Sequence, residues 1–291
     1  MKIAALYNLK GGVGKTAAAV NLAALAARDG LRTLLLDLDP QGASSFYFRV
    51  RPSRKFNAEK FAKGKKLHKH IKETDYKNLD LLPADLSFRS LDIIFDDVKN
   101  PHKQLSKVMS QLSGDYDIVL IDAPASIGVE SENVFHAADK LIIPLVPAVL
   151  SIESYNKVFE FYGLHGFDTS SILAFFSMVD ARKKMHRETV EKYTAQGSRF
   201  LKSTIFYSSE IEQMGIYRAP IVEKHPYSRP SEAFTGLWNE LKERIFVDQR
   251  TVFFTERKQM PTGERPCVQS SSNGGTEIPS TDNHNGEKGM M

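Results

Sequence analysis

The sequence has almost no cysteine: Cys267 is the only one among 291 residues, and it lies in a polar stretch near the end of the chain. A lone cysteine cannot form a disulfide framework, and no Cys/His spacing typical of a metal site is present. The sequence also lacks an apolar run of about 18 residues, the length that spans a bilayer. Its first residues reach a polar glycine turn too early for a signal peptide. These absences predict a cytoplasmic protein without thiolate chemistry.

Positive charge is modest overall but unevenly distributed. The formal net charge is +4, yet residues 49–72 contain ten lysines and arginines against one acid, Glu59. A cluster of this kind attracts polyanions, because binding releases the counterions that surround them. A solvated surface without any ligand has the same composition. The sequence leaves both interpretations open.

Short apolar runs alternate with helical patterns along residues 1–247. Strands are expected at 2–7, 32–39, 79–84, 116–124, 139–147 and 170–180, and helices at 16–30, 86–96, 101–112, 151–162 and 231–246. Most of the strand runs are continuously apolar, which is typical of strands buried on both faces. The pattern predicts an α/β fold, a single domain with a doubly wound, mainly parallel sheet. Residues 248–291 become poor in apolar side chains and are expected to form a largely disordered C-terminal extension.

A glycine-rich turn between the first expected strand and helix carries the clearest functional signal. Its glycines allow backbone N–H groups to turn inward on a phosphate, and the helix start adds its positive end. Lys15 can then reach the β- and γ-phosphates, and the Thr16 hydroxyl can ligate Mg²⁺. The pattern predicts a site for ATP and Mg²⁺. The predicted phosphate loop comprises Lys10, Gly11, Gly12, Val13, Gly14, Lys15 and Thr16.

This loop is a variant of the general phosphate-loop pattern G-x-x-x-x-G-K-[ST]. Leu9 stands where the first glycine would be, and Lys10 precedes the glycine pair. Three further segments follow in order: DLDPQG at 37–42, IVLIDAP at 118–124 and FFSMVDAR at 175–182. Together the four resemble the deviant Walker A family of P-loop ATPases, which includes ParA, Soj and MinD.

The resemblance extends over about residues 1 to 247 and assigns roles to individual positions. It implies that Lys10 is the signature lysine, which crosses a nucleotide-sandwich dimer to the phosphates of the partner. It also implies that Asp39 orients the attacking water, that Asp37 and Asp122 lie near the magnesium ion, and that Met178 lies near the adenine. A lysine in trans is physically sensible, because MgATP still carries about two negative charges. Carboxylates at strand ends can also serve as helix caps, and that alternative stays open for the three aspartates.

The implied activity is that of a ParA-like ATPase with slow hydrolysis on its own. Such a protein binds MgATP, forms an ATP-dependent homodimer and attaches to nonspecific DNA of the nucleoid. A ParB-type protein or another cargo adaptor stimulates hydrolysis, and the cycle positions a plasmid, a chromosome or another cargo. Residues 244–258 lack the clean amphipathic face that membrane attachment needs, so attachment to a membrane is not expected.

Two segments depart from the ParA pattern. Ala125 replaces the second proline that usually follows the Walker B aspartate, and residues 203–234 differ from the ParA stretch whose arginines help bind nonspecific DNA. Acids and serines occupy that zone instead: Ser208, Ser209, Glu210 and Glu212. DNA contacts are available from residues 49–72 or from Arg182, Lys183, Lys184, Arg187, Arg218, Lys224 and Arg229.

Two rival functions remain. The first is a cargo-positioning or secretion-associated switch that recruits a protein complex without binding DNA. The second is a nucleotide-sensing scaffold that dimerises without turnover.

Overall fold

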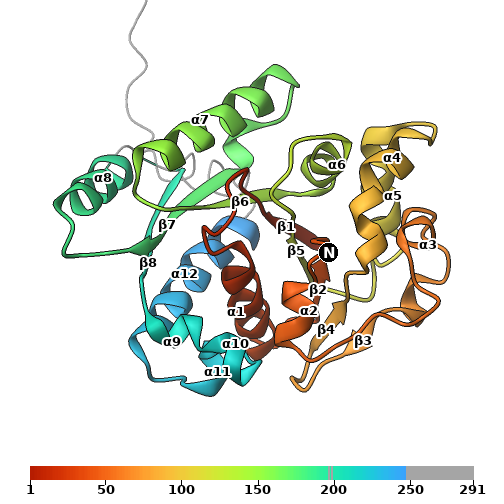
Figure 1. The fold of residues 1–291 in the computed structure, drawn as a ribbon, viewed down its shortest axis with the longest axis horizontal. Helices are drawn as coiled ribbons and strands as arrows, with labels where there is room; N and C mark the ends of the chain where they lie inside the picture. Colours follow the sequence, from red (N-terminus) through yellow and green to blue (C-terminus); the bar gives the residue numbers. More distant parts are fainter. Residues whose placement is uncertain (196, 198, 247–291) are drawn as a thin grey trace, which may run out of the picture. The chain divides into compact units, whose positions relative to one another are not determined.

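A sheet of eight strands runs through the centre of the computed structural model, which describes residues 1–195, 197 and 199–246 (Figure 1). The strand order is β3-β4-β2-β5-β1-β6-β7-β8. Neighbouring strands are parallel except for the antiparallel pair β3 and β4 at one edge. The predicted α/β fold with a mainly parallel sheet is therefore confirmed. The strands are β1 (Lys2–Leu6), β2 (Thr33–Asp37), β3 (Lys72–Glu73), β4 (Leu79–Leu82), β5 (Ile118–Asp122), β6 (Lys140–Leu145), β7 (Ile172–Val179) and β8 (Phe200–Phe206).

Helices cover both faces of the sheet and enclose two apolar cores. One core lies beneath α1, α11 and α12, and the other beneath α3 to α7; Figure 1 shows α1 and α12 on the side of the sheet opposite α7. The alanines of α1 are almost all buried, so this helix packs closely on the sheet. The helices are α1 (Lys15–Arg28), α2 (Ala43–Tyr47), α3 (Ala58–Ala62), α4 (Leu91–Asp96), α5 (Gln104–Ser110), α6 (Val129–Ala137), α7 (Val149–Leu164), α8 (Lys184–Thr194), α9 (Ser209–Glu212), α10 (Met214–Tyr217), α11 (Ile221–Lys224) and α12 (Arg229–Phe246).

Residues 86–96, predicted as one helix, form a 3₁₀ helix followed directly by an α-helix. A 3₁₀ helix covers Leu86–Ser90, and α4 follows it at once. Asp85 caps the first part, because its Oδ1 accepts hydrogen bonds from the N–H and the hydroxyl of Ser87 at 2.9 and 2.6 Å. The tighter turn therefore starts at a side-chain cap.

The carboxyl ends of β1, β2 and β5 meet at one edge of the sheet. Asp122 at the end of β5 is in register with Leu6 of β1 and with Asp37 of β2. Ligands of open α/β sheets bind at this edge, where strands lead into loops. The predicted phosphate loop lies here, between β1 and α1.

The predicted C-terminal extension, residues 248–291, lies outside the described residues. In the part of the chain that the structure describes, no helix is both long enough and apolar enough to span a bilayer.

Candidate nucleotide site

The phosphate loop has a backbone that requires glycine at two positions. Gly12 and Gly14 adopt φ angles of +70° and +89°, a conformation that L side chains rarely adopt. A Cβ on Gly14 would in addition lie 2.8 Å from Ser177 Oγ. Gly14 caps α1, and the first turn of that helix contains no acid. The N–H groups and the positive end of α1 are therefore available to an anion.

Lys15 lies at the base of this loop and is only 8% exposed. Its Nζ donates a hydrogen bond to the carbonyl of Asn8 at 3.4 Å, and it forms no ion pair among the described residues. Burial lowers the pKa of Lys15, while the charges of Asp122 and Asp39 oppose that shift. A phosphate at the loop would supply the close negative charge that a buried ammonium needs.

Lys10 differs from Lys15 in that its side chain is exposed to solvent. Its backbone N–H donates to Oδ1 of Asn8 at 2.9 Å. Asn8 is completely buried, donates from Nδ2 to the carbonyl of Pro144 in β6 at 2.8 Å, and accepts from the hydroxyl of Ser154 in α7 at 3.2 Å. Asn8 thus joins the start of the loop to two other elements. Sequence reasoning missed Asn8 and Ser154, which lie 146 positions apart.

Asp37 and Asp122, the aspartates predicted for the metal site, accept hydrogen bonds from serines in the first turn of α2. Asp122 accepts a hydrogen bond from Ser44 Oγ at 2.8 Å. Asp37 accepts from the N–H and the hydroxyl of Ser45 at 2.8 and 2.7 Å, and its Oδ1 is buried without a partner among the described residues. Burial raises the pKa of Asp37 to about 8, with Asp122 contributing, and raises that of Asp122 to about 6. Neither serine was predicted.

These carboxyl groups fit a hard divalent cation. Two buried aspartates side by side repel each other, and a cation restores the ionised form of both. Burial raises the pKa of Asp122, and hydrogen bonding by Ser44 and then Thr16 opposes that rise. In the described ranges, no group of three or more His, Cys, Asp or Glu side chains is arranged to hold a metal ion. Mg²⁺ in nucleotide sites takes phosphate oxygens and waters in addition to one or two carboxylates.

A cavity of about 400 Å³ opens in front of the loop. Most of the residues predicted for nucleotide binding line it: Gly11, Gly12, Gly14, Lys15, Thr16, Asp39 and Met178. Val13 does not line this cavity, since its side chain is buried in the core. Asp39 accepts a hydrogen bond from the N–H of Gln41 at 2.9 Å and is only partly exposed. Met178 has a φ of +54°, which bends the end of β7 at the cavity wall.

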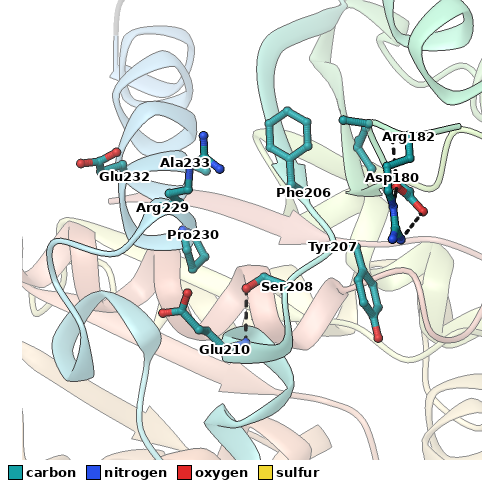
Figure 2. A pocket seen from close by; sticks show the side chains of 12 residues that line it. Asp180, Arg182, Phe206, Tyr207, Ser208, Glu210, Arg229, Pro230, Glu232 and Ala233 are labelled. Atoms are coloured by element: carbon teal, nitrogen blue, oxygen red, sulfur yellow. Dashed lines mark hydrogen bonds and ion pairs between the residues drawn. The ribbon is translucent and has the colours of Figure 1, made fainter. Parts of the chain in front are cut away.

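A second cavity of about 650 Å³ adjoins the first (Figure 2). Both cavities are lined by Phe206, the last residue of β8, and by Tyr207 and Ser208, which follow it. Figure 2 shows the second cavity bounded by Asp180 and Arg182 beyond β7 on one side and by the start of α12 on the other. The two cavities together extend from the phosphate loop past Met178, as an extended ligand such as a nucleotide requires.

A hydrogen bond joins the segment between Asp122 and α6 to the residue that follows β1. The hydroxyl of Tyr7, one residue beyond β1, donates a hydrogen bond to the carbonyl of Ser126 at 2.7 Å. Tyr7 is 1% exposed, and its ring packs edge-on against Phe135 at 4.8 Å between centroids. Tyr7 was not predicted, because its partner lies 119 positions away along the chain.

Comparison with known proteins identifies relatives along most of the chain. A family model described as AAA domain matches residues 1–164. The virulence plasmid ParA family protein pGP5-D of Chlamydia psittaci is 28% identical over 260 residues, 87% of this chain and 98% of that relative. The chromosome-partitioning ATPase Soj of Treponema pallidum is 27% identical over 249 residues, 84% of this chain and 98% of that protein.

A similar solved structure is that of a putative plasmid partition protein from Borrelia burgdorferi bound to AMPPNP. It matches with a TM-score of 0.74 at 23% identity, covering 84% of this chain and 99% of the other. At this identity the likeness establishes the fold, which agrees with the sheet and helix layers described above.

Proposed function

The chain belongs to the AAA domain family, as a ParA-like member of the ParA, Soj and MinD type of P-loop ATPases, and from this premise we propose that it is an ATP-driven dimerisation switch. In this proposal a single subunit binds MgATP, and two subunits close face to face over two nucleotides. Hydrolysis is slow until a partner stimulates it. The closed dimer attaches to nonspecific DNA, and hydrolysis releases it.

The observation that carries the proposal is the contrast between the two lysines of the loop. Lys15 is buried at the base of the cavity, where it serves the nucleotide of its own subunit. Lys10 is exposed outside that cavity, yet its backbone is fixed by Asn8. An exposed cation on a fixed backbone suits a contact with the phosphates of a second subunit, where it would stabilise both the dimer and the charge of the transition state.

The other predicted residues have roles in the same reaction. Asp39 orients the attacking water, and Met178 contacts the adenine at the junction of the two cavities. Thr16, Asp37 and Asp122 hold Mg²⁺, which would neutralise developing phosphate charge. The relatives support ATP with Mg²⁺ as ligands, since a related fold binds AMPPNP and another, from Pyrococcus horikoshii, is a MinD protein complexed with Mg-ADP.

The biological role follows that of the relatives. Plasmid and chromosome partition proteins are prominent among them, so we propose a cytoplasmic, nucleoid-associated protein that positions a plasmid, a chromosome or another cargo. A ParB-type protein or another cargo adaptor would be the stimulating partner. The residue range that acts as the ATPase domain is 1–247, with 248–291 as an extension.

Phosphate release by the full chain in MgATP tests the enzymatic part of the proposal. We expect slow release in the wild type and at least about a hundredfold less in Asp39→Ala, because the water loses its orienting carboxylate. Asp75→Ala removes an exposed aspartate that pairs with Arg49 and should leave the rate unchanged. No release above background in the wild type would make the protein a nucleotide-sensing scaffold rather than an ATPase, and equal measurable rates in the wild type and Asp39→Ala would remove the role of Asp39.

A second candidate is a cargo-positioning switch that recruits a protein complex without DNA. It is favoured by Glu210 and Glu212, acids in the zone where ParA proteins carry DNA-binding arginines. Retention of the wild type on random-sequence duplex DNA in MgATP at low salt separates the two. Absence of retention would favour this second candidate.

A further inference from the structure

Eight exposed lysines and arginines lie in the segment that contains α3 and the 3₁₀ helix at Leu67–Lys69. We call these side chains the basic surface. Every one of them is exposed, and Glu59 is the only acid in the sequence between Arg49 and Lys72. The segment lies between α2 and the edge strand β3, and α3 packs against α4 and α5. The basic surface consists of Arg51, Arg54, Lys55, Lys60, Lys63, Lys65, Lys66 and Lys69.

The apolar side chains of the same segment point inward and fix its backbone. Phe56, Phe61 and Leu67 are 3%, 0% and 1% exposed and belong to one apolar core. Phe61 packs on Phe88 with 5.0 Å between ring centroids. The apolar core therefore fixes the backbone that carries these lysines and arginines, and the positive charge stays concentrated in one region.

Few carboxylates neutralise this charge. Within the described ranges, Lys63 pairs with Glu59 at 3.4 Å, and at the border Arg49 pairs with Asp75 at 2.8 Å. None of the other lysines and arginines of the basic surface has a carboxylate within ion-pair distance among those residues. Burial lowers the pKa of His70, and Lys60 contributes to that shift, as expected beside accumulated positive charge.

The chemistry of the surface favours nucleic acid over a membrane. Between residues 49 and 72 no large apolar side chain is exposed, so nothing is available to insert among lipid chains. Lysines and arginines that contact only phosphate need no exact geometry and read no sequence. Figure 1 places α3 near one edge of the sheet and α9, which contains Glu210 and Glu212, on the side of β8 at the other edge.

We propose that the basic surface binds the phosphate backbone of duplex DNA without sequence preference. This inference rests on the proposed function and adds to it the place of the DNA contact. The basic surface takes over the role that the arginines of residues 203–234 have in ParA proteins.

The experiment measures binding of a labelled random-sequence duplex by fluorescence anisotropy in MgATP, between about 50 and 200 mM salt. The test variant changes Lys55, Lys65, Lys66 and Lys69 to Gln. These four side chains make no described hydrogen bond or ion pair, so the variant removes charge and little else. The matched control changes four exposed lysines elsewhere to Gln and has the same net charge: Lys99, Lys157, Lys192 and Lys202.

The expected result is at least a tenfold loss of affinity in the test variant, with a slope of log affinity against log salt that is shallower by up to about 3.6. The control should lose less than about threefold, since it changes only the overall charge. Both variants should retain wild-type ATP affinity, which shows that the fold is intact. None of the eight lysines lies in the nucleotide site.

Four outcomes would overturn the inference. Equal losses in both variants would assign the effect to net charge, and unchanged affinity in the test variant would place the DNA contact elsewhere while leaving the proposed function intact. If the test variant loses binding to vesicles of equal phosphatidylglycerol and phosphatidylcholine while its DNA binding is unchanged, the basic surface is a lipid site. If the wild type binds no DNA at all, the DNA part of the proposed function fails together with this inference.

Discussion

The hydroxyl of Tyr7, which lies between β1 and the phosphate loop, contacts the segment that follows Asp122. Tyr7 donates to the carbonyl of Ser126, and both residues lie within a few positions of groups assigned to nucleotide chemistry. We expect Tyr7→Phe to leave ATP affinity unchanged, because Tyr7 does not line the cavity. The kcat for hydrolysis should fall about fivefold, the equivalent of about one hydrogen bond.

A matched control separates positioning from stability in this test. Tyr162→Phe also removes a buried hydroxyl, which accepts a hydrogen bond from Ser171 at 3.3 Å far from the site. It should leave both KM and kcat unchanged. If Tyr7→Phe and Tyr162→Phe behave alike in steady-state kinetics, the hydroxyl of Tyr7 has no positioning role.

Glu130 in the first turn of α6 is a buried carboxyl whose Oε1 has no partner among the described residues. Burial, and then the charges of Asp92 and Asp39, raise the pKa of Glu130 to about 8. The folded state therefore keeps a proton that the unfolded chain releases near its ordinary pKa of 4.5. Stability should fall as pH rises from about 4.5 to about 8, by up to about 1.4 kcal/mol per pH unit.

Glu130→Gln should remove that part of the pH dependence, because an amide does not titrate. Denaturant unfolding of the nucleotide-free protein at several pH values measures the slope for the variant and the wild type. Glu160→Gln on the exposed face of α7 is the control and should keep the wild-type slope. Parallel slopes for the wild type and Glu130→Gln would refute the raised pKa.

Among the helices, the carboxylate of Asp29 at the end of α1 binds two side chains of α12. Asp29 accepts hydrogen bonds from Trp238 Nε1 at 2.9 Å and from Lys242 Nζ at 2.6 Å. Asp29→Ala leaves the buried indole N–H without its partner, so we expect the free energy of unfolding to drop by about 1–3 kcal/mol. Asp168→Ala, whose carboxylate caps a short exposed turn at Ser170, should cost less. Equal costs in denaturant titrations would contradict the attachment.

The elements also show which parts of the fold can be predicted from sequence. The central strands were predicted because they are apolar without interruption, whereas β8 was not, since Leu201 and Ile205 are buried but Lys202 and Phe206 are exposed. Helix α8 was missed because most of its side chains are polar, and only the polar His186 is buried. An edge strand or a surface helix lacks the apolar pattern on which such predictions depend.

The same limit applies to the site. The loop from Lys10 to Thr16 could be predicted, because its glycines and lysines act where they stand in the sequence. The hydrogen bonds of Asn8 to Pro144 and of Tyr7 to Ser126 could not, since each joins residues more than a hundred positions apart. Only the folded sheet brings β1, β5 and β6 together.

In the whole molecule, two separate regions carry the two proposed functions. The candidate nucleotide site lies at the carboxyl edge of the central strands, and the basic surface lies around α3, which packs against α4 and α5. One nucleotide-dependent event, the closure of two subunits, would then double the number of basic surfaces in one particle. Two surfaces bind DNA more tightly than one, because the second contact is made at high effective concentration.

The central claim is that MgATP joins two copies of this chain through Lys10. Sedimentation velocity of the full chain as Asp39→Ala, in which turnover is blocked, tests it most directly. We expect one subunit in MgADP, two in MgATP, and one again in MgATP when Lys10→Ala is added, with Lys10→Arg restoring the dimer. A particle of a single subunit for Asp39→Ala in saturating MgATP, or a dimer that forms equally well without Lys10, would contradict it.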